Sequence, residues 1–115
     1  MSASGAGGPI IPDYAGANVR GIVPSLLGPA SWEHGLPSWM PEPVASASST
    51  VLLVLDGLGW DQLEDHRESM PTVSSMVGGP IHTVAPTTTA TALTSIATGL
   101  TPAEHGIIGY RILLG

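Results

Sequence analysis

A chain of 115 residues has room for one domain at most, and its 43% hydrophobic content without any cysteine excludes a disordered polymer and a disulfide framework. Three arginines, no lysine and a formal net charge of −6 argue against a nucleic-acid partner, because phosphate backbones are bound by clustered lysine and arginine. Charged residues make up only 10% of the chain, against about 25% in an ordinary soluble domain. We therefore expect much of the chain to face the interior of a larger body.

The sequence shows no targeting or membrane signal. No lysine or arginine precedes an apolar segment near the N-terminus, so we expect no secretory signal. No apolar run approaches the roughly 20 residues that cross a bilayer. We expect a cytoplasmic protein without membrane contact, and the sequence does not indicate an oligomeric state.

The composition changes near residue 50, and we expect two parts, residues 1–49 and residues 50–115. The first part is rich in Pro, Gly, Ala and Ser, and its prolines exclude long helices and central strands. We expect an irregular arm of short turns; a flexible leader is the alternative, although disordered segments seldom carry so many aliphatic side chains. The expected anchors of the arm are Ile10, Ile11, Ile22, Val23, Leu26, Leu27, Trp32 and Trp39.

The second part begins with an uninterrupted apolar run. The stretch TVLLVLD, residues 50–56, predicts a strand buried on both faces, as in a parallel sheet flanked by helices. Pro71 then suits the first turn of a helix, and Gly78 or Gly79 suits its end. PIHTVAP, residues 80–86, predicts a second short strand.

TTTATALTSIATG, residues 87–99, predicts a helix. Its threonines can cap the N-terminus, and Gly99 fits the end. Its apolar residues recur at helical spacing, at Leu93, Ile96, Ala97 and Leu100. Strand, helix, strand and helix in this order predict an α/β fold, a sheet flanked by helices and preceded by the Pro/Gly-rich arm.

Asp56 ends the first predicted strand. Ligands of open α/β sheets lie beyond the carboxyl ends of the strands, and Gly57 and Gly59 let the backbone turn and approach a ligand closely. A carboxylate there can hold a divalent cation or act as a base. A turn or a helix cap is the alternative interpretation of Asp56.

The threonines that follow Pro86 lie where the second predicted strand leads into a helix. A helix N-terminus offers free N–H groups and the positive end of the helix dipole, which suit a phosphate. A hydroxyl there could attack phosphorus if a bound metal lowered its pKa. A threonine-rich N-cap is the alternative interpretation.

These residues resemble the alkaline phosphatase superfamily, in its branch of type I phosphodiesterases and nucleotide pyrophosphatases. The resemblance covers about residues 50–110 and rests on VLLVLDGLGWDQL, MPTVSSMV and APTTTATALTSIATGLTPAEHGIIGY. In that family the first strand ends in a metal-binding aspartate, matched by Asp56. A P-T-x-T motif ends in the nucleophile, matched by Thr89, and T-G-L-x-P-x-x-H-G-I follows, matched by residues 98–107.

The resemblance implies a metal-dependent phosphohydrolase with two divalent ions, both zinc, and a phosphothreonine intermediate. Thr89 is then the nucleophile and, with Asp56, a metal ligand. The substrate would be a small-molecule phosphate ester or a nucleotide. The family's other ligands lie far downstream, so residues 50–115 are expected to be the N-terminal part of an alkaline-phosphatase-like catalytic domain, truncated and inactive by itself.

The sequence also allows other functions. Family members usually follow the nucleophile with F-P-N-H, whereas this chain has Ala90, Thr91, Ala92 and Leu93. A phosphomonoesterase or phosphonate hydrolase of the same superfamily is therefore an alternative, as is a catalytically inactive binding or structural fragment.

The remaining ionisable side chains predict no further site. We expect His105 to hold its loop, His82 to pack or hydrogen-bond, and His34 and His66 to be exposed. The carboxylates expected to form a solvated helix face are Asp61, Glu64, Asp65 and Glu68.

Overall fold

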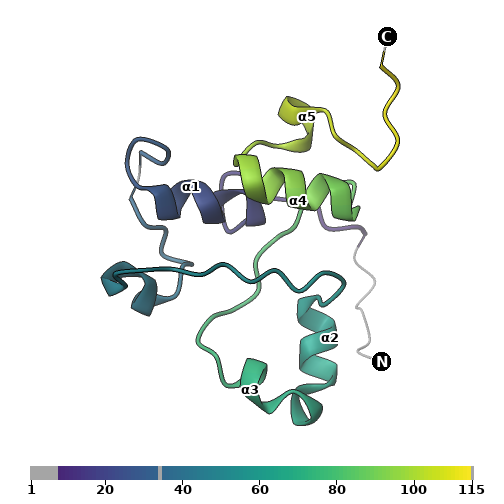
Figure 1. Ribbon diagram of the computed structural model, residues 1–115. Coiled ribbons are helices and arrows are strands. Elements are labelled where there is room, and N and C mark those ends of the chain that lie inside the picture. The colour runs from purple at the N-terminus through teal and green to yellow at the C-terminus, as the bar shows by residue number, and fades with distance from the viewer. Residues whose placement is uncertain (1–7, 34, 115) are drawn as a thin grey trace. The chain divides into compact units, whose positions relative to one another are not determined.

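The computed structural model describes residues 8–33 and 35–114 (Figure 1). Within these residues the regular structure is helical, and no strand is present. The extended backbone pairs at one isolated parallel bridge, between Asn18 and His82. The predicted α/β sheet is therefore wrong. An apolar run can favour extended backbone, but a strand also needs a neighbour that completes its hydrogen-bond ladder.

The helices are short. In chain order they are η1 (Val19–Gly21), α1 (Ile22–Leu27), η2 (Glu42–Ser46), α2 (Trp60–Asp65), η3 (Arg67–Ser69), α3 (Pro71–Ser74), α4 (Thr89–Thr98) and α5 (Pro102–His105), where η denotes a 3₁₀-helix. None of the helices within the described ranges has the length and apolar character that crossing a bilayer requires.

The chain divides into two compact units. The first unit comprises residues 41–80 with residues 8–10, and the second comprises residues 11–40 and 81–114. Residues of the predicted arm therefore join the C-terminal residues in one unit. A domain boundary near residue 50 stays a prediction.

The first unit contains the predicted first strand as an extended segment without a ladder partner. All five side chains of residues 51–55 are exposed, from 42% for Leu52 and Val54 to 92% for Val51. The backbone N–H of Leu58 donates to the carbonyl of Leu55 at 3.3 Å, which closes a turn over Asp56 and Gly57. Gly57 has a φ of +76°, a value that glycine adopts without steric cost.

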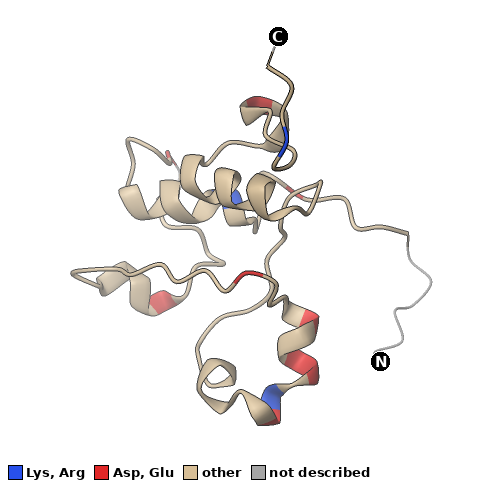
Figure 2. Ribbon diagram, turned by 45° about the vertical axis from the view of Figure 1, so that its right-hand side comes forward, with Lys and Arg blue, Asp and Glu red and all other residues tan. Residues whose placement is uncertain are grey.

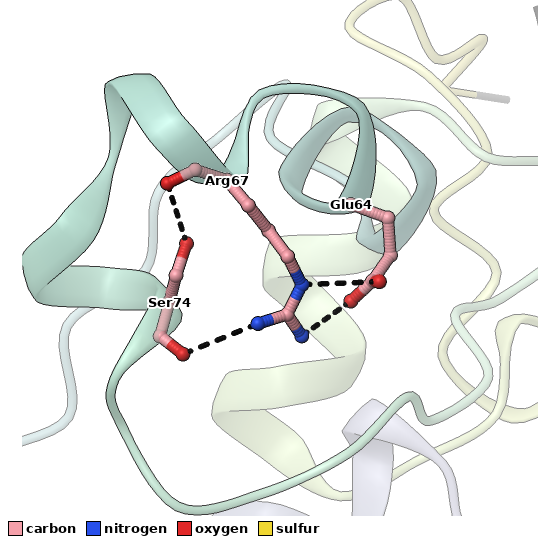
Figure 3. A network of polar contacts seen from close by, with 3 residues as sticks. All are labelled: Glu64, Arg67 and Ser74. Atoms are coloured by element: carbon pink, nitrogen blue, oxygen red, sulfur yellow. Dashed lines mark hydrogen bonds and ion pairs between the residues drawn. The ribbon is translucent and has the colours of Figure 1, made fainter.

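Helices α2 and α3 are joined by one arginine. The Arg67 guanidinium donates to both carboxylate oxygens of Glu64, at 3.1 and 2.7 Å, and to the carbonyl of Ser74 at 3.4 Å (Figure 3). The Ser74 hydroxyl donates back to the carbonyl of Arg67 at 3.3 Å. Helix α3 begins at Pro71 as expected, but it ends at Ser74, before the two glycines.

The acidic residues of α2 and η3, coloured red in Figure 2, are exposed, as expected for a solvated helix face. The exposed acidic residues there are Asp61, Glu64, Asp65 and Glu68. His66 is exposed as well, whereas His34 lies outside the described residues. The guanidinium of Arg67 holds the pKa of Glu64 below its usual range, mainly through their hydrogen bond.

The second unit is built around α4, which packs against η1, α1 and α5 (Figure 1). The predicted helix is confirmed, with Thr88 as its N-cap and Gly99 as its C-cap. The Thr88 hydroxyl accepts from the backbone N–H of Thr91, and Gly99 adopts a left-handed φ of +73°. Pro24 lies where a Cβ on Gly99 would fall, so this position also requires the smallest residue.

The buried face of α4 is polar. Thr91 and Ser95, one turn apart, are fully buried, whereas Leu93 is 44% exposed and Leu100, just beyond the helix, is 41% exposed. Small hydroxyl side chains allow η1 and α1 to approach α4 closely, provided that each hydroxyl has a hydrogen-bond partner. The apolar spacing predicted the helix but not the face that it buries.

Candidate active site

Residues of the N-terminal arm hold in place the segment that leads into α4. The backbone N–H of His82 donates to the carbonyl of Ala17 at 2.8 Å, and the N–H of Val19 donates to the carbonyl of His82 at 2.9 Å. The Nδ1 atom of His82 accepts from the backbone N–H of Asp13 at 3.0 Å, which confirms the hydrogen-bonding role expected of this histidine. These bonds fix the backbone that leads to the threonines at residues 87–89.

Thr89, the expected nucleophile, is the first residue of α4 and is half-buried. Its position follows from Thr88, which has extended backbone and caps the helix. The first amides of a helix lack partners within the helix, and the dipole makes this end attractive to negative charge. The arrangement therefore suits a phosphoryl group or an alkoxide near Thr89.

The hydroxyl of Thr88 links α4 to the segment that follows α5. It donates to the carbonyl of Ile108 at 3.1 Å, and the Thr91 hydroxyl lies 2.7 Å from it. Since the Thr88 proton is used on Ile108, the Thr91 hydroxyl is the donor of the second bond. Thr88 thus fixes both the start of the helix and a neighbouring loop.

His105 provides a second link between the same segments. Its Nδ1 accepts from the backbone N–H of Ile107 at 3.0 Å, and its Nε2 lies 2.9 Å from the Ser95 hydroxyl. A neutral ring that accepts at Nδ1 carries its proton on Nε2, so His105 donates to Ser95. The expected role of His105 in holding its loop is confirmed.

The N-terminus of α5 is held by a glutamate. The backbone N–H and the hydroxyl of Thr101 donate to the same Glu104 carboxylate oxygen, at 2.7 and 2.8 Å. These bonds, the backbone one first, hold the pKa of Glu104 below its usual range. Glu104 therefore makes a structural contact inside the T-G-L-x-P-x-x-H-G-I motif, which also contains His105.

Asp56 and Thr89 belong to different units. Asp56 is exposed in the turn of the first unit, and Thr89 lies in the second unit. Within the described residues, no group of three or more His, Cys, Asp or Glu side chains could hold a metal ion. These residues therefore do not complete a metal site by themselves, because a catalytic zinc takes three protein ligands.

Sequence reasoning missed the contribution of the arm to this site. Tyr14, Asn18 and Arg20 contact residues 65 to 79 positions away, at Thr83, Ala85 and Gly99. No local periodicity reports such contacts. The short side chain of Asn18 does predict a cap for η1, since its Oδ1 accepts from the N–H of Arg20 at 3.1 Å.

Comparison with known proteins identifies the second half of the chain. The family model described as Type I phosphodiesterase / nucleotide pyrophosphatase matches residues 50–113, more than half of the chain. The predicted resemblance to this branch of the alkaline phosphatase superfamily is thereby confirmed at the level of the family. Neither a curated protein nor a solved structure matches the chain.

Proposed function

Because the chain belongs to the type I phosphodiesterase / nucleotide pyrophosphatase family, we propose that its Thr89 hydroxyl is the nucleophile of a phosphohydrolase. The family indicates a hydrolase of phosphodiesterase or pyrophosphatase type, acting on small-molecule phosphate esters or nucleotides. The observation that carries the proposal is the position of Thr89 at the first residue of α4, inside the matched stretch.

The proposed reaction has two displacements. The Thr89 oxygen bonds to phosphorus and loses its proton, while the bond from phosphorus to the leaving oxygen breaks and that oxygen gains a proton. Water then attacks the phosphothreonine, restoring the hydroxyl and releasing the phosphate product. The positive end of the helix dipole at the start of α4 favours the negative charge that develops beside Thr89.

The family is typically metal-dependent. We propose two zinc ions, with Asp56 and Thr89 as this chain's contributions to their ligands. Bound metal would stabilise negative charge on the reacting oxygens. Since the described residues hold no cluster of three ligands, further ligands are needed to complete the proposed sites.

The incomplete ligand set also favours a second candidate. A binding or structural module could keep the same helices without turning over a substrate. The two candidates differ in one respect that can be measured, because only the enzyme depends on the Thr89 hydroxyl for hydrolysis.

The test is a comparison of threonine variants in the intact protein. Thr89→Ala should lower kcat/KM for a phosphodiester substrate by on the order of 10³-fold or more, since a nucleophile cannot be replaced by positioning alone. Thr89→Ser keeps a hydroxyl and should retain part of the activity. Thr94→Ala is the matched control, because the Thr94 hydroxyl lies on the same helix and donates to the carbonyl of Ala90.

Each outcome decides between the candidates. Loss of hydrolysis in Thr89→Ala but not in Thr94→Ala supports the nucleophile. Undiminished metal-dependent hydrolysis in Thr89→Ala contradicts it. A folded protein without hydrolysis in any version favours the binding or structural module. Phosphomonoesters and phosphonates assayed in parallel separate the related superfamily activities.

A further inference from the structure

A short segment of the N-terminal arm contacts both the residues that lead into α4 and the residue that ends it. The Tyr14 hydroxyl accepts from the backbone N–H of Ala85 at 3.0 Å, on the approach to the helix. The Asn18 side-chain amide donates to the carbonyl of Thr83 at 3.0 Å. At the other end, the Arg20 Nε donates to the carbonyl of Gly99 at 3.0 Å. We call Tyr14, Asn18 and Arg20 the brace.

The three residues of the brace also hold one another. The Nη1 atom of Arg20 donates to the carbonyl of Tyr14 at 3.1 Å, and Oδ1 of Asn18 accepts from the N–H of Arg20 at 3.1 Å. Asn18 is fully buried, and its side chain both donates and accepts. A buried side-chain amide that is hydrogen-bonded at both its oxygen and its nitrogen favours a single geometry, because a shift would break these bonds.

Charge strengthens the hold at the C-terminal end of α4. The guanidinium of Arg20 meets a carbonyl where the helix dipole is negative, so the bond is assisted by charge. The guanidinium also lies 5.9 Å from the ring centroid of Trp32, a favourable position for a cation over an aromatic ring. Arg20 is therefore held from two sides.

The brace lies outside the stretch that the family model matches, residues 50–113. We infer that Tyr14, Asn18 and Arg20 are positioning residues, which place the start of α4, and with it Thr89, for the reaction. They act through the backbone at residues 83–85 and 99. The catalytic part of this inference rests on the proposed function. A reacting oxygen misplaced by about 1 Å can cost on the order of a hundredfold in rate.

The test uses Tyr14→Phe in the intact protein, a change that removes one hydroxyl and keeps the ring. Tyr110→Phe is the matched control, since Tyr110 is 80% exposed. Hydrogen exchange of the Ala85 amide should become roughly fivefold faster in Tyr14→Phe, because one hydrogen bond of ordinary strength is lost. The value of kcat should fall about tenfold while KM stays within about twofold. Tyr110→Phe should change none of these quantities.

Several outcomes separate this inference from the proposed function. Unchanged Ala85 exchange and unchanged kcat in Tyr14→Phe overturn the brace. Faster exchange with unchanged kcat overturns its role in the reaction and leaves a structural contact. If the wild-type protein hydrolyses no phosphodiester, the proposed function fails and the catalytic role of the brace falls with it, while the exchange result still decides whether Tyr14 holds the approach to α4.

Discussion

Ser95 is an interior hydroxyl whose hydrogen-bond partner lies ten residues later in the chain. It is fully buried in α4, and the Nε2 proton of His105 reaches it at 2.9 Å. The same ring accepts from the N–H of Ile107. Two hydrogen bonds through one imidazole therefore fasten the segment after α5 to the helix that begins with Thr89. A metal-binding histidine would need to keep one ring nitrogen available, and His105 uses both.

Replacement of His105 tests this contact. His105→Ala leaves the buried Ser95 hydroxyl without its donor, so we expect the free energy of unfolding to fall by about 1–3 kcal/mol. Ser95→Ala should cost less by itself, and the double variant should lose less stability than the sum of the two single losses, because it leaves no buried hydroxyl without a donor. Urea unfolding of the four proteins measures this. Strictly additive losses would show that the two side chains do not interact.

Glu104 gives a prediction about pH. Its pKa is lowered by hydrogen bonds from Thr101, the backbone bond first, so the bonds favour the ionised carboxylate. The stabilisation of the start of α5 is therefore present above the ordinary pKa of a glutamate, and it is lost as the pH falls through the lowered value. An NMR titration of the Glu104 carboxyl should give a midpoint below the usual range.

Thr101→Val supplies the comparison for that titration. The variant keeps the backbone donor and removes the hydroxyl, which is the second cause of the shift. The midpoint of Glu104 should move up without reaching the ordinary value. An unshifted wild-type midpoint would mean that the carboxylate does not accept from Thr101 in solution.

At the scale of elements, α4 could be predicted because its signals are local. A threonine able to cap lies before the helix and a glycine with positive φ ends it, and each signal acts within a few residues. The start of α3 at Pro71 was predictable for the same reason. The buried polar face of α4 was not predictable, because the elements that pack against it, η1 and α1, are far away in the sequence.

The cap of α4 can be tested by one substitution. Thr88→Ala removes the acceptor for the N–H of Thr91 and the donor to the carbonyl of Ile108, so we expect a loss of about 1–2 kcal/mol in the free energy of unfolding. Thr88→Ser keeps the oxygen and should lose much less. Thr98→Ala, at the last residue of the same helix, is a control for removing a threonine hydroxyl. Equal losses for Thr88→Ala and Thr88→Ser would contradict the cap.

At the scale of the whole molecule, the expected sheet is the main difference between sequence and structure. Residues 51–55 have the composition of a buried strand, yet they are extended and exposed in the first unit. Composition can make a segment suited to a strand, but a sheet exists only where other strands pair with it, and that pairing is not local. Asp56 follows this segment and lies in a turn, and its role as a metal ligand stays a proposal.

In the N-terminal arm, the sequence predicted the lack of long helices but not the specific contacts that the arm makes. Its proline spacing correctly excluded long helices, since α1 has six residues. Composition gave no sign that Asn18 and Arg20 make specific contacts with the residues around α4. Of the expected anchors, Trp32 and Trp39 lie against Gly21, whereas Ile10, Ile11 and Leu27 are 70% exposed or more. The size of an apolar side chain alone therefore predicts its burial poorly in a segment without a periodic pattern.

In the proposed reaction Thr89 carries the phosphoryl group during turnover, and trapping that intermediate is the most direct test. The intact protein is mixed with a phosphodiester substrate, quenched in acid within the first turnovers and analysed by peptide mass spectrometry. We expect phosphothreonine at Thr89, absent from Thr89→Ala and present in Thr94→Ala. Rapid hydrolysis with no modified threonine, or modification at another residue, would contradict it.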